Sequence, residues 1–123
     1  MTTSEKTWHT ESDARQEQLE ATVQRVVDQV RVSVATREPK IAHSFFYGAM
    51  GIDPVHLVIW YIFAKDSDKE TADKSGLLQV LDTESRDRLR AEGYPPQVLN
   101  RIYVSFASEE EIQKAGGWRE FFA

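Results

Sequence analysis

Residues 57–63 form an unbroken run of apolar and aromatic side chains, Leu-Val-Ile-Trp-Tyr-Ile-Phe. A strand with one face in water alternates apolar and polar positions, whereas a strand covered on both faces does not. The run, extended to residues 56–64, therefore predicts a central strand that has other elements packed above and below it. It is far too short to cross a bilayer as a helix.

The segment 12–36 has a helical pattern. Its apolar side chains recur at spacings of three and four and form one stripe, made of Leu19, Val23, Val26, Val27, Val30 and Val34. Valine is a mediocre helix former, so we expect packing against the rest of the domain to support this helix. Residues 1–10 lack the stripe and predict a flexible tail anchored only by Trp8. Residues 11–123 then form one globular domain.

Two further strands are predicted. Residues 41–47 are rich in strand-favouring aromatic side chains, and the glycine-containing loop 48–54 joins them to the central strand as a hairpin. Residues 102–107 alternate apolar and polar positions, which is typical of an edge or half-covered strand. The long connection before them allows a right-handed crossover, so this strand can run parallel to the central one.

Helical segments connect and follow these strands. They cover residues 68–74 and 77–92, which Gly93 ends, and a short stretch before the glycines at 116–117. Capping-box spacing, which satisfies free N–H groups at a helix start, occurs at Ser67 with Glu70 and at Ser108 with Glu111. The order of elements predicts an α/β or α+β fold with a small, about three-stranded sheet, an N-terminal amphipathic helix, a central helical pair and a short C-terminal helix.

The chain ends in an aromatic cluster formed by Trp118, Phe121 and Phe122. Monomeric proteins seldom leave such clusters exposed, so we expect these side chains to fold back onto the core. The alternative is an exposed anchor for a partner protein, because aromatic side chains are common at the centre of protein interfaces.

Charge narrows the classes of partner. Nucleic-acid-binding proteins cluster Lys and Arg against phosphates, whereas here 15 basic residues are spread among 20 acidic ones and the net charge is −5. We therefore expect no direct nucleic-acid or membrane partner and a basic protein as the favoured one. The alternative is that the negative charge only keeps the protein soluble and recognises no partner. With no cysteine and no secretory signal in residues 1–6, the chain is expected in the cytoplasm.

Acidic side chains gather at two predicted helix starts. The candidate partner-binding residues are Asp66, Asp68, Glu70, Asp73, Glu109, Glu110 and Glu111. Acids at a helix start complement the helix dipole, which is a sufficient structural explanation for them. If the second and third strands are parallel, however, both helix starts leave the same end of the sheet and form one acidic surface for Lys or Arg side chains.

A second candidate site combines His43, Asp53 and His56. If the hairpin brings the two imidazoles opposite each other, they and the carboxylate would form a ligand set that suits zinc or iron. Ordinary hydrogen bonding of both histidines is the simpler interpretation, since the spacing matches no recognised metal motif. Catalytic and nucleotide-binding motifs are also missing, so we expect neither an enzyme nor a bound cofactor.

These observations favour a non-catalytic cytoplasmic protein that binds another, basic protein through its acidic surface. The size, acidity and lack of motifs are similar in kind to those of small bacterial immunity proteins, which inhibit a toxin enzyme by covering it; no residue roles follow from that similarity. One alternative is a small enzyme or ligand-binding domain with a pocket near His43, Tyr47, Asp53 and His56. Another is a structural subunit that self-associates through the valine stripe as a homo-oligomer.

Overall fold

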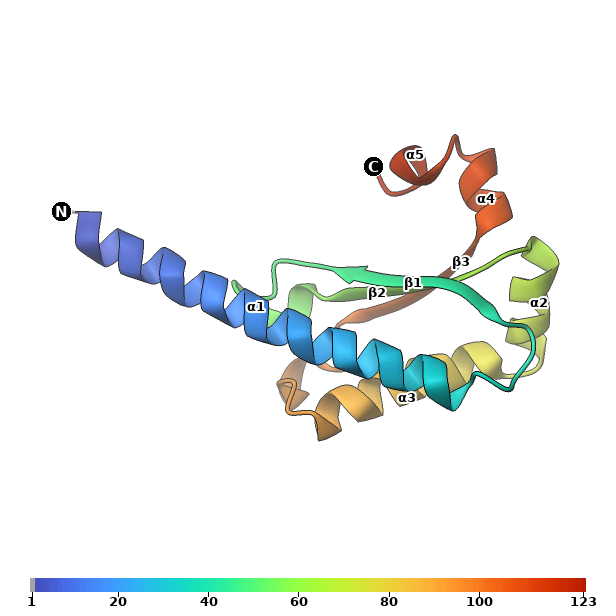
Figure 1. Cartoon of the computed structure of the whole chain (residues 1–123), viewed down its shortest axis with the longest axis horizontal. Coiled ribbons are helices and arrows are strands. Elements are labelled where there is room, and N and C mark those ends of the chain that lie inside the picture. The colour runs from blue at the N-terminus through green and yellow to red at the C-terminus, as the bar shows by residue number, and fades with distance from the viewer. Residues whose placement is uncertain (1) are drawn as a thin grey trace.

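The computed structural model describes the backbone of residues 2–123 and the side chains of residues 11–123. In chain order the elements are α1 (Thr2–Ser33), β1 (Ile41–Tyr47), β2 (Val58–Phe63), α2 (Asp66–Lys74), α3 (Leu77–Ala91), β3 (Tyr103–Ser108), α4 (Glu109–Lys114) and α5 (Trp118–Phe121), with short 3₁₀ turns at Pro54–His56 and Pro96–Val98 (Figure 1). The fold is a small α+β domain, as predicted. Because α1 begins at Thr2, it starts earlier than the predicted 12–36. The flexibility of residues 1–10 stays a prediction, since their side chains lie outside the description.

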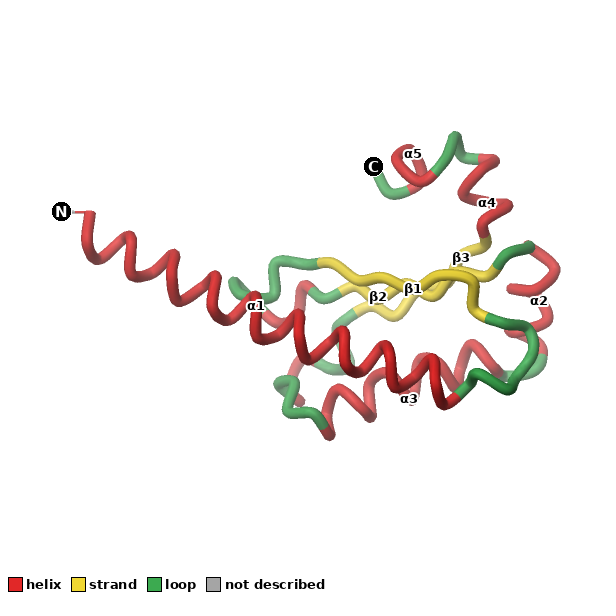
Figure 2. Tube along the Cα trace, in the orientation of Figure 1, coloured by secondary structure: helices red, strands yellow, loops and turns green. Residues whose placement is uncertain are grey.

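The sheet has the strand order β1-β2-β3 and is mixed (Figure 2). β1 and β2 form the predicted antiparallel hairpin, with Phe45 opposite Trp60. β2 and β3 are parallel, with Trp60 opposite Ser105. The apolar run at 57–63 is therefore the central strand, and β3 lies at an edge.

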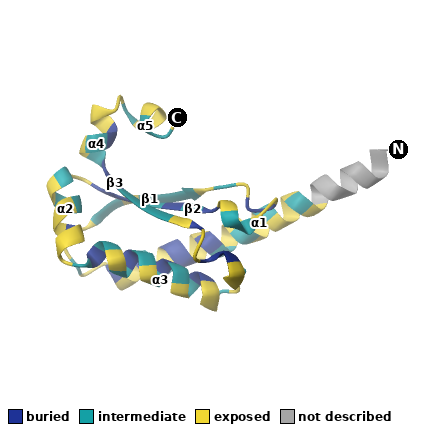
Figure 3. Cartoon of the chain, turned by 180° about the vertical axis from the view of Figure 1, so that it is seen from behind, coloured by how far each residue is buried: buried dark blue, intermediate teal, exposed yellow. Residues whose placement is uncertain are grey.

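Helices α1 and α3 pack against each other beneath one face of the sheet (Figure 1). Alternate residues of β2 point into this layer, and Ile59, Tyr61 and Phe63 are fully buried. The apolar stripe of α1 meets them, with its buried members Val23, Val26, Val27, Val30 and Val34. Since this stripe belongs to the core of its own domain (Figure 3), it does not serve as the self-association surface that the structural-subunit alternative required.

The opposite face of the sheet is covered only in part, by α4 and α5. Ile62, Ala107 and Ile112 form a small second core. Phe121 and Phe122 pack on it, and the Phe122 ring lies 5.0 Å from Trp60 and 5.1 Å from Phe45. The C-terminal aromatic cluster thus folds back, although Trp118 stays at the surface with 38% exposure.

The uncovered part of this face lies over the N-terminal ends of β2 and β3. Tyr47 and Tyr103 are 47% and 66% exposed there. The predicted two-sided cover of β2 therefore holds for its C-terminal half, where Ile62 is fully buried. Val58 and Trp60 are only half-buried on this face. The apolar run predicted cover along the whole strand, but α4 and α5 are too short to cover its N-terminal half.

Two helix boundaries test the predictions about capping. Ser108 and Glu111 form the predicted capping box at the start of α4. The capping box predicted at Ser67 and Glu70 is wrong, because α2 already begins at Asp66, with Lys65 at the N-cap and no side-chain cap. Asp66 bonds instead to α4 and β3, so a tertiary contact determines where this helix starts.

One buried polar contact ties α3 to the sheet. The hydroxyl groups of Tyr61 and Ser85, both fully buried, lie 2.7 Å apart and share a hydrogen bond. Burial raises the pKa of Tyr61 to about 12. Each hydroxyl satisfies the other in the buried core, where an unpaired polar group would be destabilising.

Candidate functional site: an acidic hollow at one end of the sheet

The candidate site lies where β2 and β3 end. The parallel register places Phe63 beside Ser108, so the two strands finish level with each other. Each strand leads within three residues into a helix, α2 at Asp66 and α4 at Glu109. The two strands are parallel, as the length of their connection allowed, so the condition for both acidic helix starts to leave the same end of the sheet is met.

A network of hydrogen bonds joins the two helix starts. The buried Ser108 hydroxyl donates to Asp66 and accepts from the Glu111 N–H at 3.0 Å. The second oxygen of Asp66 accepts from Lys114 Nζ at 2.7 Å. The Asp66 N–H in turn donates to Glu110 Oε1 at 2.7 Å. These contacts explain why α2 begins at Asp66 without a cap of its own.

Glu111 has a structural role in the same network. Its Oε1 atom accepts from the Ser108 N–H at 2.8 Å and from Lys69 Nζ at 3.0 Å. One carboxylate therefore closes the cap of α4 and holds a side chain of α2. Of the predicted partner-binding residues, Asp66, Glu110 and Glu111 are thus engaged in holding the two helices together.

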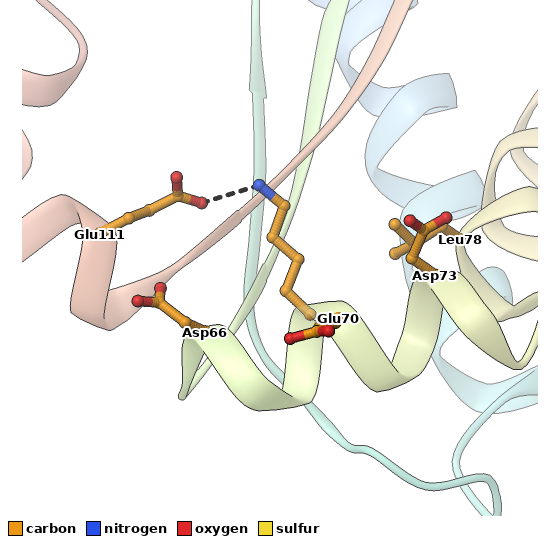
Figure 4. A pocket seen from close by; sticks show the side chains of 6 residues that line it. Asp66, Glu70, Asp73, Leu78 and Glu111 are labelled. Carbon is orange, nitrogen blue, oxygen red and sulfur yellow. Dashed lines mark hydrogen bonds and ion pairs between the residues drawn. The ribbon is translucent and has the colours of Figure 1, made fainter.

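Beside this network the surface is hollowed. The acidic hollow has a volume of about 420 Å³ and is lined by Asp66, Lys69, Glu70, Asp73, Leu78 and Glu111 (Figure 4). Four carboxylates and one ammonium group give the lining a net charge of three negative. In Figure 4 the dashed line marks the ion pair between Lys69 and Glu111, which crosses the hollow. Leu78 supplies an apolar wall that the stem of a Lys or Arg side chain could contact.

The remaining predicted acids surround the hollow. Glu70 is exposed and pairs with Lys74 at 2.8 Å, a contact that holds the pKa of Glu70 below its usual value. Asp73 is also exposed. Asp68 is half-buried on α2 and does not line the hollow. Glu109 lies on the far side of α4, where its carboxylate is 3.6 Å from His43 Nε2.

Sequence reasoning missed the lysines of this surface. Lys69 and Lys114 neutralise part of the acidic patch by pairing with Glu111 and Asp66. Lys69 lies three residues after Asp66 and Lys114 three after Glu111, so each shares a helix face with an acid. That spacing indicated that each lysine lies on the same side of its helix as an acid, but it did not indicate that the lysine pairs with an acid of the other helix.

We expect acid to weaken the junction between α2 and α4. Hydrogen bonds from Lys114 and Ser108 hold the pKa of the Asp66 carboxyl below its usual 3.8. A carboxyl with a lowered pKa stabilises the folded state above its unfolded-state pKa, and this contribution disappears as the pH falls through the lowered value. NMR titration should show the Asp66 carboxyl and the Glu111 amide changing together below pH 3.8. An Asp66 midpoint at or above that value would contradict the network, and Asp66→Asn should remove the coupled change.

The metal and pocket candidates are not brought together. The register places His43 opposite Ile62, whereas His56 lies in the turn that precedes β2, at the other end of the hairpin. Asp53 caps that turn by accepting from the Val55 N–H at 3.0 Å. Among the residues whose side chains are described, no three His, Cys, Asp or Glu gather as a metal site. The hairpin therefore separates the groups that the metal and enzyme alternatives required.

No known protein family, curated protein or solved structure matches this chain. The fold and the site together define a small α+β domain with a mixed three-stranded sheet and an acidic hollow at one end of that sheet. Throughout residues 2–123, no helix is long and apolar enough to span a membrane.

Proposed function

We propose that this protein binds a basic partner protein through the acidic hollow and carries out no chemistry of its own. The observation that carries the proposal is a hollow lined by four carboxylates from two helices. Lysines pair with three of them, and Asp73 is the fourth. Charged surfaces of this kind attract an oppositely charged partner and orient it during approach. An Arg or Lys side chain entering the hollow would meet Glu70 and Asp73, neither of which is needed for the junction of the two helices.

In its most specific form, the proposal is that this protein is an inhibitor of the immunity type. Such an inhibitor acts in the cytoplasm by covering the active site of a basic enzyme, for example a bacterial toxin. The cysteine-free sequence suits a reducing compartment. The acidic surface suits enzymes whose own substrates are anionic, because a basic active site recognises both. The general form, binding of a basic protein, does not depend on this more specific one.

The proposal is tested by capture of partners from the native host at low and high salt, followed by mass spectrometry. We expect a basic protein that is retained at low salt and released at high salt, because screening weakens exposed charge pairs. An enzyme inhibited by stoichiometric addition of this protein would support the inhibitor form. Capture of acidic or neutral proteins alone, or retention independent of salt, would contradict a charge-based mode of binding.

A double charge reversal should separate the contribution of the acidic hollow to partner association from the contribution of the overall net charge. Glu70→Lys with Asp73→Lys is expected to reduce the association rate constant for the captured partner about tenfold or more at low salt, since charge mainly sets the rate of encounter. Glu111 is unsuitable for this purpose because it closes the cap of α4. The measurement is surface plasmon resonance at several salt concentrations.

The control is Asp13→Lys with Glu17→Lys, which makes the same change in net charge at exposed positions of α1. It should alter the rate constant far less, because those positions lie away from the acidic hollow. Equal effects of the two double variants would assign the attraction to net charge and remove the hollow from the explanation.

A further inference from the structure

The outer edge of β3 has open hydrogen-bonding groups. The Tyr103 N–H donates to the Leu57 carbonyl at 3.1 Å, so the backbone groups of Tyr103 face β2. Successive residues of a strand turn their N–H and C=O groups to opposite sides. The backbone groups of Val104 and Phe106 therefore point away from the sheet, and two donors and two acceptors lie along this edge.

The two ends of that edge are already satisfied within the chain. The Ile102 N–H donates to the Val98 carbonyl at 3.1 Å, and the Ile102 carbonyl accepts from Arg86 at 3.3 Å. At the other end the Ser108 N–H donates to Glu111 at 2.8 Å. The open stretch is thus confined to the middle of β3. Side-chain and loop hydrogen bonds described for residues 11–123 do not reach its four groups.

The side chains of β3 do not protect this edge. Soluble proteins usually block an edge strand with charged residues, proline or a covering element, but β3 has the sequence Tyr-Val-Ser-Phe-Ala-Ser. The other edge of the sheet differs, because Arg31 of α1 donates to the Ile41 carbonyl at 3.1 Å and to the Ser44 hydroxyl at 2.9 Å. Helix side chains hold the β3 edge only at its two ends, through Arg86 of α3 at Ile102 and Glu111 of α4 at Ser108, and the backbone groups between them are left open.

The charges at the two ends of β3 are opposite. The exposed Arg101 precedes the strand and forms no ion pair within the side chains described. The acidic hollow lies at the other end, where Glu111 caps Ser108 and Asp66 bonds to it. A second copy aligned antiparallel along this edge would bring its Arg101 to the acidic hollow of the first, and the reverse contact would form at the same time.

We propose that two copies of this chain pair along their β3 edges, antiparallel, to form one continuous six-stranded sheet. A two-fold axis opposite Ser105 places Val104 of each copy beside Phe106 of the other, in the register that lets their open groups exchange four hydrogen bonds. This contact is isologous, so it closes on itself and stops at a dimer. It does not involve the valine stripe and its evidence does not rest on the proposed function, but it places Arg101 at the acidic hollow, so dimerisation and binding of a basic partner would compete.

The pairing is tested by sedimentation equilibrium of the isolated chain at low salt. The contact is short, so we expect a weak dimer: the average mass should rise from 14.1 kDa toward twice that value between ~10 μM and ~1 mM protein. A mass that stays at 14.1 kDa across that range would overturn the proposal.

Variants identify the edge. Val104→Pro removes an outward N–H without touching the bonds to β2 and should abolish the dimer. Arg101→Glu, at an exposed position that leaves the fold intact, should weaken dimerisation about tenfold or more, and adding Asp73→Lys should restore much of it by exchanging the two charges. Arg119→Glu makes the same change in net charge on α5 and is the matched control. A dimer equally sensitive to Arg101→Glu and Arg119→Glu, or unaffected by both Arg101→Glu and Val104→Pro, would place the contact elsewhere.

Discussion

Replacing Phe63 with alanine should lower the free energy of unfolding by about 3–5 kcal/mol, the usual range for a large aromatic side chain removed from a core. Phe63 lies at the end of the central strand and is completely buried in the larger core cluster. Its neighbours belong to regular elements and can collapse only partly into the space. Urea unfolding followed by circular dichroism measures the change.

Tyr103→Ala is the control for this prediction. Tyr103 is an aromatic residue of the same sheet, but 66% of it is exposed on the uncovered face. Its removal should change the free energy of unfolding by less than about 0.5–1 kcal/mol, as is usual for surface substitutions. If the two variants were equally destabilised, the assignment of one face of the sheet as core and the other as partly open would be wrong.

The second large effect is expected at Gly48, where the chain leaves β1. Gly48 has φ +139°, and a Cβ atom there would lie 2.2 Å from the carbonyl oxygen of His56. That oxygen belongs to the backbone and cannot rotate away. Backbone strain of about 1–3 kcal/mol then adds to the displacement of the turn, so we expect Gly48→Ala to lower the free energy of unfolding by more than about 3 kcal/mol.

Gly93→Ala separates the effect of an unfavourable backbone conformation from the effect of a steric clash. Gly93 ends α3 with φ +91°, and no atom lies within 4 Å of the position of a Cβ. Only the unfavourable backbone conformation remains, so the loss should be about 1–2 kcal/mol. Thermal unfolding of both variants provides the comparison, and a loss at Gly93 as large as that at Gly48 would show that steric contact with His56 is not the cause.

The acidic surface has two kinds of carboxylate. Asp66, Glu110 and Glu111 accept hydrogen bonds that fix α2 against α4, whereas Glu70 and Asp73 stand at the rim of the hollow. Reversing the first kind would disturb the fold together with any binding. Mutational tests of partner recognition are therefore informative only at Glu70 and Asp73. The difference between the two kinds of carboxylate depends on contacts between segments far apart in the chain.

The uninterrupted run at 57–63 was enough to predict a central strand, since no other position in a small sheet accommodates apolar side chains on both faces. The spacing of valines predicted which side of α1 enters the core, and the capping box at Ser108 located the start of α4. These features are local: periodicity and capping depend on residues within a few positions of one another. The length of the connection before β3 allowed a parallel direction, but the structure decided it.

The sequence by itself determined the fold class, the central strand, the core face of α1 and the presence of acids at two helix starts. Only the tertiary structure decided that those helix starts share a network around Ser108, that Lys69 and Lys114 neutralise part of the acidic surface, and that His43 and His56 lie at opposite ends of the hairpin. The start of α2 belongs to this second group, because Asp66 bonds across to α4 instead of capping its own helix. The physical reason is the same in each case. The contacts of this network join residues 42 to 48 positions apart, as in the bonds of Asp66 with Ser108 and with Lys114. They depend on strand register and direction, on which neither composition nor local spacing bears.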